Sequence, residues 1–314
     1  MIKQISIQNI ETNEVLEFIA DKPPFVIDTI DWDMPSVSMD SYRVPFQVGT
    51  TLSGVTVGTR KPTVTGYITA GLESEEVLGM TWKEYFEKQE EAIQENKMKL
   101  DKLISVYQDV LITVGDYFLN ARPTQPPKYS TDMKENNEVI CYFSLEFECY
   151  NPLFYKGSKL ISLAMISGGF HFPLIIPSEK VIFGEIFRWQ SISIENNGDA
   201  DVGCIIRIKA NGGVVKNPKI YNVNTNEFLE FDGVTLDNGD YITITTDIGE
   251  ENAVKHDIST TTDISVIGNL KPKSKFFQIK QGSNFYAYYV EEEYINNVEI
   301  SIEYTERYFN VRGM

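Results

Sequence analysis

Histidine and cysteine are scarce in this sequence of 314 residues, and neither occurs at a metal-binding spacing. The histidines are His171 and His256, and the cysteines are Cys141, Cys149 and Cys204. Zinc sites need such residues in closely spaced pairs, and hydrolytic triads need a histidine beside a presented nucleophile. Glycine-rich phosphate loops and dinucleotide fingerprints are also missing. We therefore predict no metal, no cofactor and no catalytic residue, and interpret the protein as a non-enzyme.

The odd number of cysteines argues against a disulfide framework. Cys141 and Cys149 lie in one predicted strand. An extended chain advances roughly 3.3 Å per residue, so these two residues are too far apart to bond. We predict three reduced, buried thiols, as expected for a protein made in a reducing cytosol.

Long apolar runs and excess positive charge are missing as well. No window of about 18 apolar residues occurs, and no basic start precedes an apolar stretch, so we predict neither a membrane span nor a signal peptide. The net charge is -17. Because such a surface repels phosphate, we expect no specific nucleic-acid site and no binding to anionic membranes.

The composition is that of an ordinary globular chain, with 42% apolar and 23% charged residues. Its length exceeds the roughly 100–200 residues of a typical domain, which favours two domains. Glycine and proline cluster within residues 155–177, and this cluster is typical of a boundary. We predict one domain over residues 1–157 and a second over residues 158–314.

The first domain is predicted to be α+β. Two β-branched runs, residues 2–10 and 15–19, flank a polar turn and predict a hairpin. Residues 25–70 read as short strands joined by loops, with strands at 55–57 and 63–68.

One long helix is predicted over residues 81–107. Thr81 and Glu84 have the spacing of a capping box. An apolar stripe follows at helical intervals: Trp82, Phe86, Ile93, Leu100, Leu103, Ile104 and Tyr107. We expect this stripe to pack on a sheet of its own domain, with contact to a neighbouring subunit as the alternative.

Beyond the helix, we predict a strand over Val110–Val114 and a proline-rich loop over residues 122–128. Residues 139–149 predict another strand, whose burial stays open because its alternation is incomplete. From residue 180 onward no helical stripe is visible. Turn signals recur there at residues 196–198, 211–213, 224–226 and 237–239, a spacing typical of an antiparallel β-sandwich.

One segment of the sequence is repeated. Residues 7–18 read IQNIETNEVLEF and residues 220–231 read IYNVNTNEFLEF. We favour two hairpins that use the same turn, and a duplicated hairpin is the alternative.

The remaining polar and aromatic candidates have simpler structural explanations. His171 lies among apolar residues and is expected to be packed, while His256 lies in a polar run and is expected to be solvated. The run Glu291-Glu292-Glu293 is expected to be a solvated turn rather than an acid/base pair. The pairs Asp199 and Asp201, and Asp237 and Asp240, do not match the calcium loop. Trp189 could stack on a sugar, but a buried tryptophan is the simpler expectation.

The C-terminal half resembles the distal tail protein family of long-tailed phages that infect Gram-positive bacteria. The resemblance covers roughly residues 170–308. Its segments are ISIENNG (192–198), NPKI (217–220), NTNE (224–227), LDNGDYITI (236–244), LKPKS (270–274), QGSN (281–284) and VEISIEY (298–304). In the N-terminal half, the strand that ends at Asn151-Pro152 is similar to the family's interdomain junction. The helix is longer than the resemblance leads us to expect, which is compatible with a contractile-tail or prophage-derived relative.

The resemblance implies an α+β N-terminal domain that assembles into a homohexameric ring, and a galectin-like C-terminal sandwich. The implied partners are the tail tube protein, the tail-tip hub protein and receptor-binding proteins. The implied location is the virion tail tip, or baseplate, after assembly in the host cytoplasm. The alternative function is a carbohydrate-binding module, and a glycosidase is a more distant third.

Overall fold

The computed structural model describes residues 4–72, 79–132, 134–137, 139–168, 184–188 and 191–312, with only the backbone described at 165–168 and 184–188. The chain forms two compact units, Met1–Lys156 with Phe309–Met314, and Gly157–Tyr308. The domain division at residue 157 stays a prediction. In the described part of the chain, strands dominate and there is one α-helix, as the sequence predicts.

The first unit holds the helix, two small sheets and a separate two-stranded hairpin, β4-β5. Its elements are β1 (Gln4–Asn9), β2 (Val15–Ile19), β3 (Phe25–Asp31), β4 (Val37–Tyr42), β5 (Thr51–Val57), β6 (Thr63–Ile68), α1 (Trp82–Leu103), β7 (Val110–Val114), β8 (Tyr117–Pro123), β9 (Lys128–Tyr129), β10 (Cys141–Glu148) and the start of β11 (Phe154–Gly168). One antiparallel sheet has the order β2-β1-β7-β8, and β6 pairs with β3 and β10 in the other. Phe18 of β2 packs against Phe25 of β3 and Phe143 of β10, so the core lies between the two sheets.

The sequence did not predict which side chains of β10 are buried, and the structure shows which they are. Its side chains alternate, with Cys141, Phe143, Leu145 and Phe147 buried. The proline-rich loop was predicted to begin at residue 122, and this prediction was wrong, because β8 continues to Pro123 and pairs there with Phe147. Proline has no backbone N–H to donate, and Pro123 is the last residue of β8, where its pairing with β10 ends.

The predicted helix is present, but it is shorter than its apolar pattern. The capping box forms at Thr81 and Glu84 as predicted. The helix ends at Leu103, whose carbonyl accepts a hydrogen bond from the Asn9 side chain of β1. This cap comes from a residue 94 positions away, so no local signal announces it.

Only part of the apolar stripe is buried. Ile93, Leu100, Leu103 and Ile104 enter the core. Trp82, Phe86 and Tyr107 are exposed, which corrects the prediction that the stripe packs as a whole.

The repeated sequence forms the same turn twice. Asn9 Oδ1 accepts from the backbone N–H groups of Glu11 and Thr12, and Asn222 Oδ1 accepts from those of Asn224 and Thr225. Residues Asn13 and Asn226 follow in the left-handed region, at φ 58° and 60°. Asparagine tolerates that region better than most residues. Both segments therefore form hairpins with the same turn, and the choice between two independent hairpins and a duplicated hairpin stays a prediction.

The second unit is an antiparallel β-sandwich, as predicted. Its elements are the rest of β11, β12 (Gly184–Arg188), β13 (Ile192–Asn196), β14 (Cys204–Ala210), β15 (Val215–Lys216), β16 (Lys219–Asn222), β17 (Phe228–Glu230), β18 (Thr235–Leu236), β19 (Tyr241–Thr245), β20 (Asn252–Asp257), β21 (Thr262–Ser265), η2 (Ile267–Asn269), β22 (Gly282–Tyr289), η3 (Glu292–Tyr294) and β23 (Val298–Tyr308). One sheet runs β11-β23-β14-β19-β20-β21, and the other runs β13-β22-β16-β17. Inward residues such as Ile206, Ile302 and Tyr286 fill a continuous core between them.

Candidate functional site

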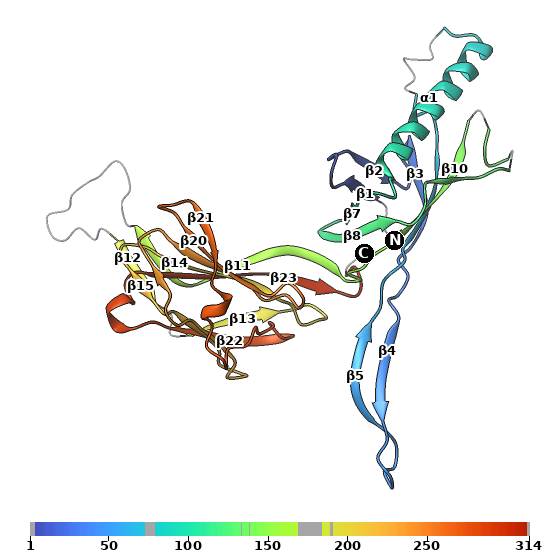
Figure 1. The fold of residues 1–314 in the computed structure, drawn as a ribbon. Coiled ribbons are helices and arrows are strands. Elements are labelled where there is room, and N and C mark those ends of the chain that lie inside the picture. The colour runs from blue at the N-terminus through green and yellow to red at the C-terminus, as the bar shows by residue number, and fades with distance from the viewer. Residues whose placement is uncertain are drawn as a thin grey trace. The chain divides into compact units, whose positions relative to one another are not determined.

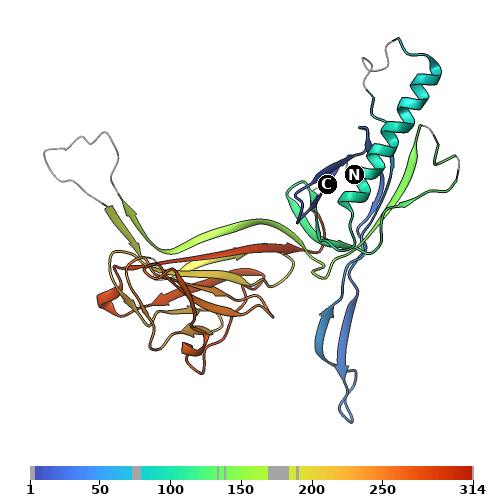
Figure 2. The same cartoon turned by 45° about the horizontal axis from the view of Figure 1, so that its top comes forward.

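A highly exposed part of the first unit is the hairpin of β4 and β5, here called the arm (residues 37–57). Figures 1 and 2 both show the arm as a two-stranded ribbon that extends away from the sheets of its own unit. The two strands pair only with each other, and almost every arm residue is exposed. Both outer edges therefore present unpaired backbone N–H and carbonyl groups.

One face of the arm is apolar. Val37 pairs with Val57 and Met39 with Val55, so these four side chains share a face. A bulge between Asp40 and Ser41 shifts the register. Leu52 therefore stays on the apolar face instead of turning to the opposite one. The apolar face consists of Val37, Met39, Leu52, Val55 and Val57, all of them exposed.

The loop at the tip of the arm contains side-chain hydrogen bonds, and it presents two exposed apolar side chains. The Gln47 side chain accepts from the Val44 N–H and donates to Thr51 Oγ1, and these bonds fix the loop. Phe46 and Val48 are fully exposed, and Phe46 has φ 70°. A bulky residue in the left-handed region is uncommon and costs conformational energy.

Arg60 anchors the base of the arm. Its side chain is completely buried, at 0% exposure, and lies 4.8 Å from the ring centre of Phe154. The guanidinium donates four hydrogen bonds to backbone carbonyls: Pro152 at 2.7 Å, Trp32 at 3.3 Å, Asp33 at 3.1 Å and Phe309 at 2.6 Å. Residues 32 and 33 lead into β4 and Arg60 follows β5, so one side chain ties both arm ends to the core.

The charge of Arg60 is held by carbonyl dipoles rather than by a carboxylate ion pair. Burial lowers the pKa of its guanidinium, while Cys149 and Asp33 act in the opposite direction. Arginine remains protonated in proteins, so a full positive charge sits at the base of the arm. Five donors in a planar fork can serve several carbonyls at once, which lysine cannot do.

A second exposed apolar surface lies on the first turns of α1. Trp82, Tyr85 and Phe86 contact one another, with ring centres 5.6 to 6.4 Å apart. Trp82 is 78% exposed. Exposed aromatic clusters of this kind are typical of interaction surfaces.

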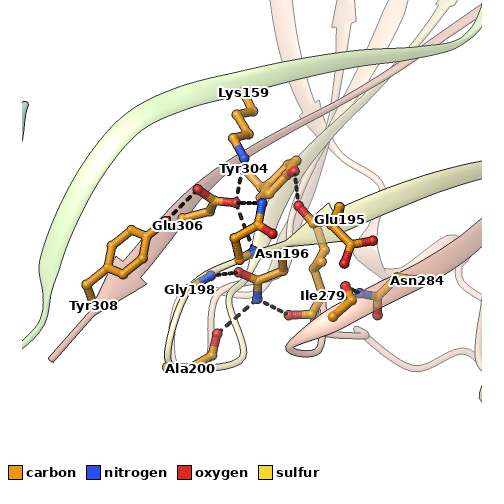
Figure 3. A network of polar contacts seen from close by, with 12 residues as sticks. Lys159, Glu195, Asn196, Gly198, Ala200, Ile279, Asn284, Tyr304, Glu306 and Tyr308 are labelled. Carbon is orange, nitrogen blue, oxygen red and sulfur yellow. Dashed lines mark hydrogen bonds and ion pairs between the residues drawn. The ribbon is translucent and has the colours of Figure 1, made fainter. Parts of the chain in front are cut away.

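The second unit contains a buried charged network around Glu306 (Figure 3). The Glu306 carboxylate accepts hydrogen bonds from Lys159 Nζ at 2.5 Å, the Asn197 backbone N–H at 2.9 Å and the Tyr308 hydroxyl at 2.8 Å. Burial alone would raise the pKa of Glu306, but these hydrogen bonds outweigh it and lower the pKa to about 2. The network ties β11, the loop after β13, and β23 together, which is a structural role.

None of the predicted polar candidates forms a catalytic or metal-binding cluster in the described part of the chain. Groups of three or more His, Cys, Asp and Glu side chains that could hold a metal are not found among the described residues. Asp240 is engaged by Lys255 and by the Ile258 N–H, and Asp201 accepts from the Gln281 N–H. The run at 291–293 is exposed and starts a 3-10 turn, as expected.

The side chain of His256, which was predicted to be solvated, is 23% exposed. His256 Nδ1 lies 2.6 Å from Asp263 Oδ1, and the ring stacks on Tyr241 at 4.4 Å. These three residues are cross-strand neighbours on β19, β20 and β21, a pairing that sequence spacing does not reveal. His171 and Trp189 lie outside the described residues.

The three cysteines are buried and free, as predicted. Burial raises the pKa of the Cys149 and Cys204 thiols to about 12. They are therefore protonated and unreactive at neutral pH. In the described part of the chain, no helix is long and apolar enough to cross a membrane.

This chain resembles one protein-family model and several solved structures. Residues 197–308 match the family model of the siphovirus-type tail component, C-terminal domain. The crystal structure of the Dit protein of phage SPP1, described as a paradigm of the hub adsorption apparatus in phages infecting Gram-positive bacteria, superposes with a TM-score of 0.60. The two chains are 14% identical, and the alignment covers 96% of this chain and 98% of the SPP1 chain.

Two structures of the phage p2 baseplate in its activated conformation, with strontium and with calcium, match at TM-scores of 0.42 and 0.41. Both are 9% identical to this chain and cover 96% of it and 98% of their own chain. A search of curated protein sequences finds no match.

The fold is thus similar to that of the SPP1 Dit protein over nearly the whole chain, and residues 197–308 match the model of the siphovirus-type tail component, C-terminal domain. The resemblance to the phage distal tail protein family predicted from the sequence is confirmed.

Proposed function

We propose that the protein is a distal tail ring subunit that joins the tail tube to the tail-tip or baseplate apparatus. In this proposal six copies associate head to tail, and the closed ring contacts the tail tube protein on one side and the tail-tip hub protein on the other. Receptor-binding proteins are further partners. The protein acts through shape-matched surfaces at the virion tail tip and not through a reactive group.

The apolar face of the arm carries this proposal. An isolated two-stranded ribbon is marginally stable in water, and this one exposes five apolar side chains on one face and two more at its tip. Its unpaired edges can also add strands to a neighbouring sheet. The arm thus combines an exposed apolar face with an anchor at its base, the buried Arg60 side chain. A contact between neighbouring subunits requires such a surface on a firmly held element.

The contact should be heterologous. An arm projecting from one copy fits a different surface on the next copy, and such contacts generate rings when their rotation closes. The fold similarity to a hub protein supports this arrangement. The acidic surface, with a net charge of -17, would keep DNA phosphates from adhering if part of it lines the channel of the ring.

The test compares substitutions on the apolar face of the arm with control substitutions on its opposite face. The purified protein is expected to show six times the 35.8 kDa chain mass by light scattering and a six-fold annulus in negative-stain images. The double variant Met39→Asp with Val55→Asp places charges on the apolar face and should yield monomers. The double variant Ser38→Asp with Thr56→Asp places the same charges on the opposite face and should keep the ring.

Circular dichroism must show that both variants fold. A wild-type protein that stays monomeric at all concentrations, or an apolar-face variant that still forms the annulus, would contradict the proposal. The alternative function of a carbohydrate-binding module stays a prediction as far as Trp189 is concerned, because this residue lies outside the described residues.

A further inference from the structure

The outer face of the sheet β13-β22-β16-β17 carries a pocket of about 470 Å³. Volumes of roughly 300–1,000 Å³ are typical of small-molecule sites. The pocket is lined by Lys219, Tyr221, Asn226, Phe228, Glu230 and Tyr289. It thus combines three aromatic rings with a few polar groups, a lining that suits a small amphipathic ligand.

The strand register explains why these side chains meet. Lys219 pairs with both Glu230 and Tyr289, and Tyr221 pairs with Phe228 on the adjacent strand. Paired residues point to the same face of a sheet. The alternate residues, such as Ile220 and Leu229, point into the core. Three strands therefore deliver the lining to one outward patch.

The Lys219 ammonium already occupies the position that a cationic ligand would take beside the aromatic rings of this pocket. Lys219 Nζ lies 4.3 Å from the Phe228 ring centre and 3.1 Å from the Glu230 carboxylate. Lys271 also forms an ion pair with Glu230. A quaternary ammonium ligand would have to displace this internal ammonium, so the pocket does not suit a cationic ligand.

The two hairpins with similar sequences show which residues the turn and the strand pairing require. The first hairpin makes the same turn, but it has Gln8 and Val15 where the second has Tyr221 and Phe228. The turn and the strand pairing therefore do not require aromatic residues at these two positions. Tyr221 and Phe228 are additions to the hairpin, and both line the pocket.

We propose that this pocket binds a neutral saccharide. Sugar rings present flat C–H faces that stack on aromatic rings, and equatorial hydroxyls that hydrogen bond with carboxylate, amide and phenol groups. Tyr221, Phe228 and Tyr289 supply the rings, and Asn226 and Glu230 supply polar partners. The volume holds one or two sugar rings. The inference goes beyond ring assembly and does not depend on it.

The experiment is a glycan array of bacterial cell-surface sugars, followed by NMR titration of the full chain with the best-binding sugar as its methyl glycoside. Tyr289 is exposed, so Tyr289→Ala should fold normally and weaken binding by roughly 3- to 10-fold, the range of one aromatic stacking contact. Phe285→Ala is the matched control. Phe285 is an exposed aromatic on the same strand and face as Tyr289, but outside the pocket lining, so binding should be unchanged.

A choline chloride titration completes the test and should give no shift at pocket residues. Array and titration without any bound sugar would overturn the proposal. Equal affinities of the Tyr289→Ala and Phe285→Ala variants would overturn it as well, and so would choline binding in place of sugars. Oligomeric state is measured in parallel, so that loss of sugar binding is distinguishable from loss of the ring.

Discussion

Replacing Arg60 should loosen the base of the arm and destabilise the first unit. Alanine at this position removes four hydrogen bonds and leaves the carbonyls of Pro152, Trp32, Asp33 and Phe309 without their donor. Buried polar groups left unsatisfied cost about 1–3 kcal/mol each, but the variant also no longer buries a cation. Each lost hydrogen bond to a charged group is worth about 1.5–3 kcal/mol, but the cost of burying the cation is lost with them, so we expect Arg60→Ala to lower the free energy of unfolding by about 3–5 kcal/mol, less than the sum of the four bonds.

Urea unfolding followed by tryptophan fluorescence is a suitable assay. Trp32 packs edge-on against Phe154, at 5.2 Å between ring centres, directly beside the guanidinium, and therefore reports on this site. Because the chain has two compact units, two transitions can occur, and only the one reported by Trp32 should move.

Two further variants separate geometry from charge. Arg60→Lys keeps the charge, but its ammonium cannot reach all four carbonyls, so its midpoint should fall between those of the wild type and Arg60→Ala. Arg122, which is exposed and pairs with Asp109, is the control, and Arg122→Ala should leave the midpoint unchanged. A free energy of unfolding for Arg60→Ala within about 1 kcal/mol of the wild type would show that the four buried carbonyls do not need the Arg60 side chain.

Two other predictions concern the second unit and the repeated turn. The pKa of Glu306 is lowered to about 2 in the folded state, so the stabilisation by its carboxylate is present above the unfolded-state pKa and is lost as the pH falls toward 2. Glu306→Gln should therefore flatten the loss of stability between about pH 4.5 and 2. An acid titration of the variant identical to that of the wild type would contradict this prediction. Asn9→Ala and Asn222→Ala each remove a side chain that accepts hydrogen bonds from two turn N–H groups, so each should lower the free energy of unfolding by about 1–3 kcal/mol. Asn9→Ala should also shorten α1, and the helical circular dichroism signal should decrease. An unchanged helix signal would show that Asn9 does not cap α1.

Local patterns in the sequence predicted much of the fold. The first hairpin, the capping box at Thr81, strand Val110–Val114 and the polar turns of the sandwich all depend on residues close together in the chain. Turn and capping preferences act over a few residues, so they can be read without tertiary information. The absence of a metal or catalytic site stays a prediction, since it was inferred from spacing alone.

The interaction surfaces could not be predicted in the same way. Val37, Met39, Leu52, Val55 and Val57 look like ordinary core residues of short strands in the sequence, and only the pairing of β4 with β5 alone leaves them exposed. Likewise, nothing near Arg60 in sequence shows that four distant carbonyls converge on it. The end of α1 depends on Asn9, which no helical period contains.

The sequence by itself determined the first hairpin, the start of the helix, the all-β character of the C-terminal region and its family resemblance, because these depend on local conformational preference and on ordered motifs. Tertiary structure alone decided which apolar residues stay in water, which carbonyls surround Arg60, and that Tyr221, Phe228 and Tyr289 share one pocket. The physical reason is that exposure and convergence are properties of strand pairing between residues far apart in the chain, and alternation along one strand does not specify its partner.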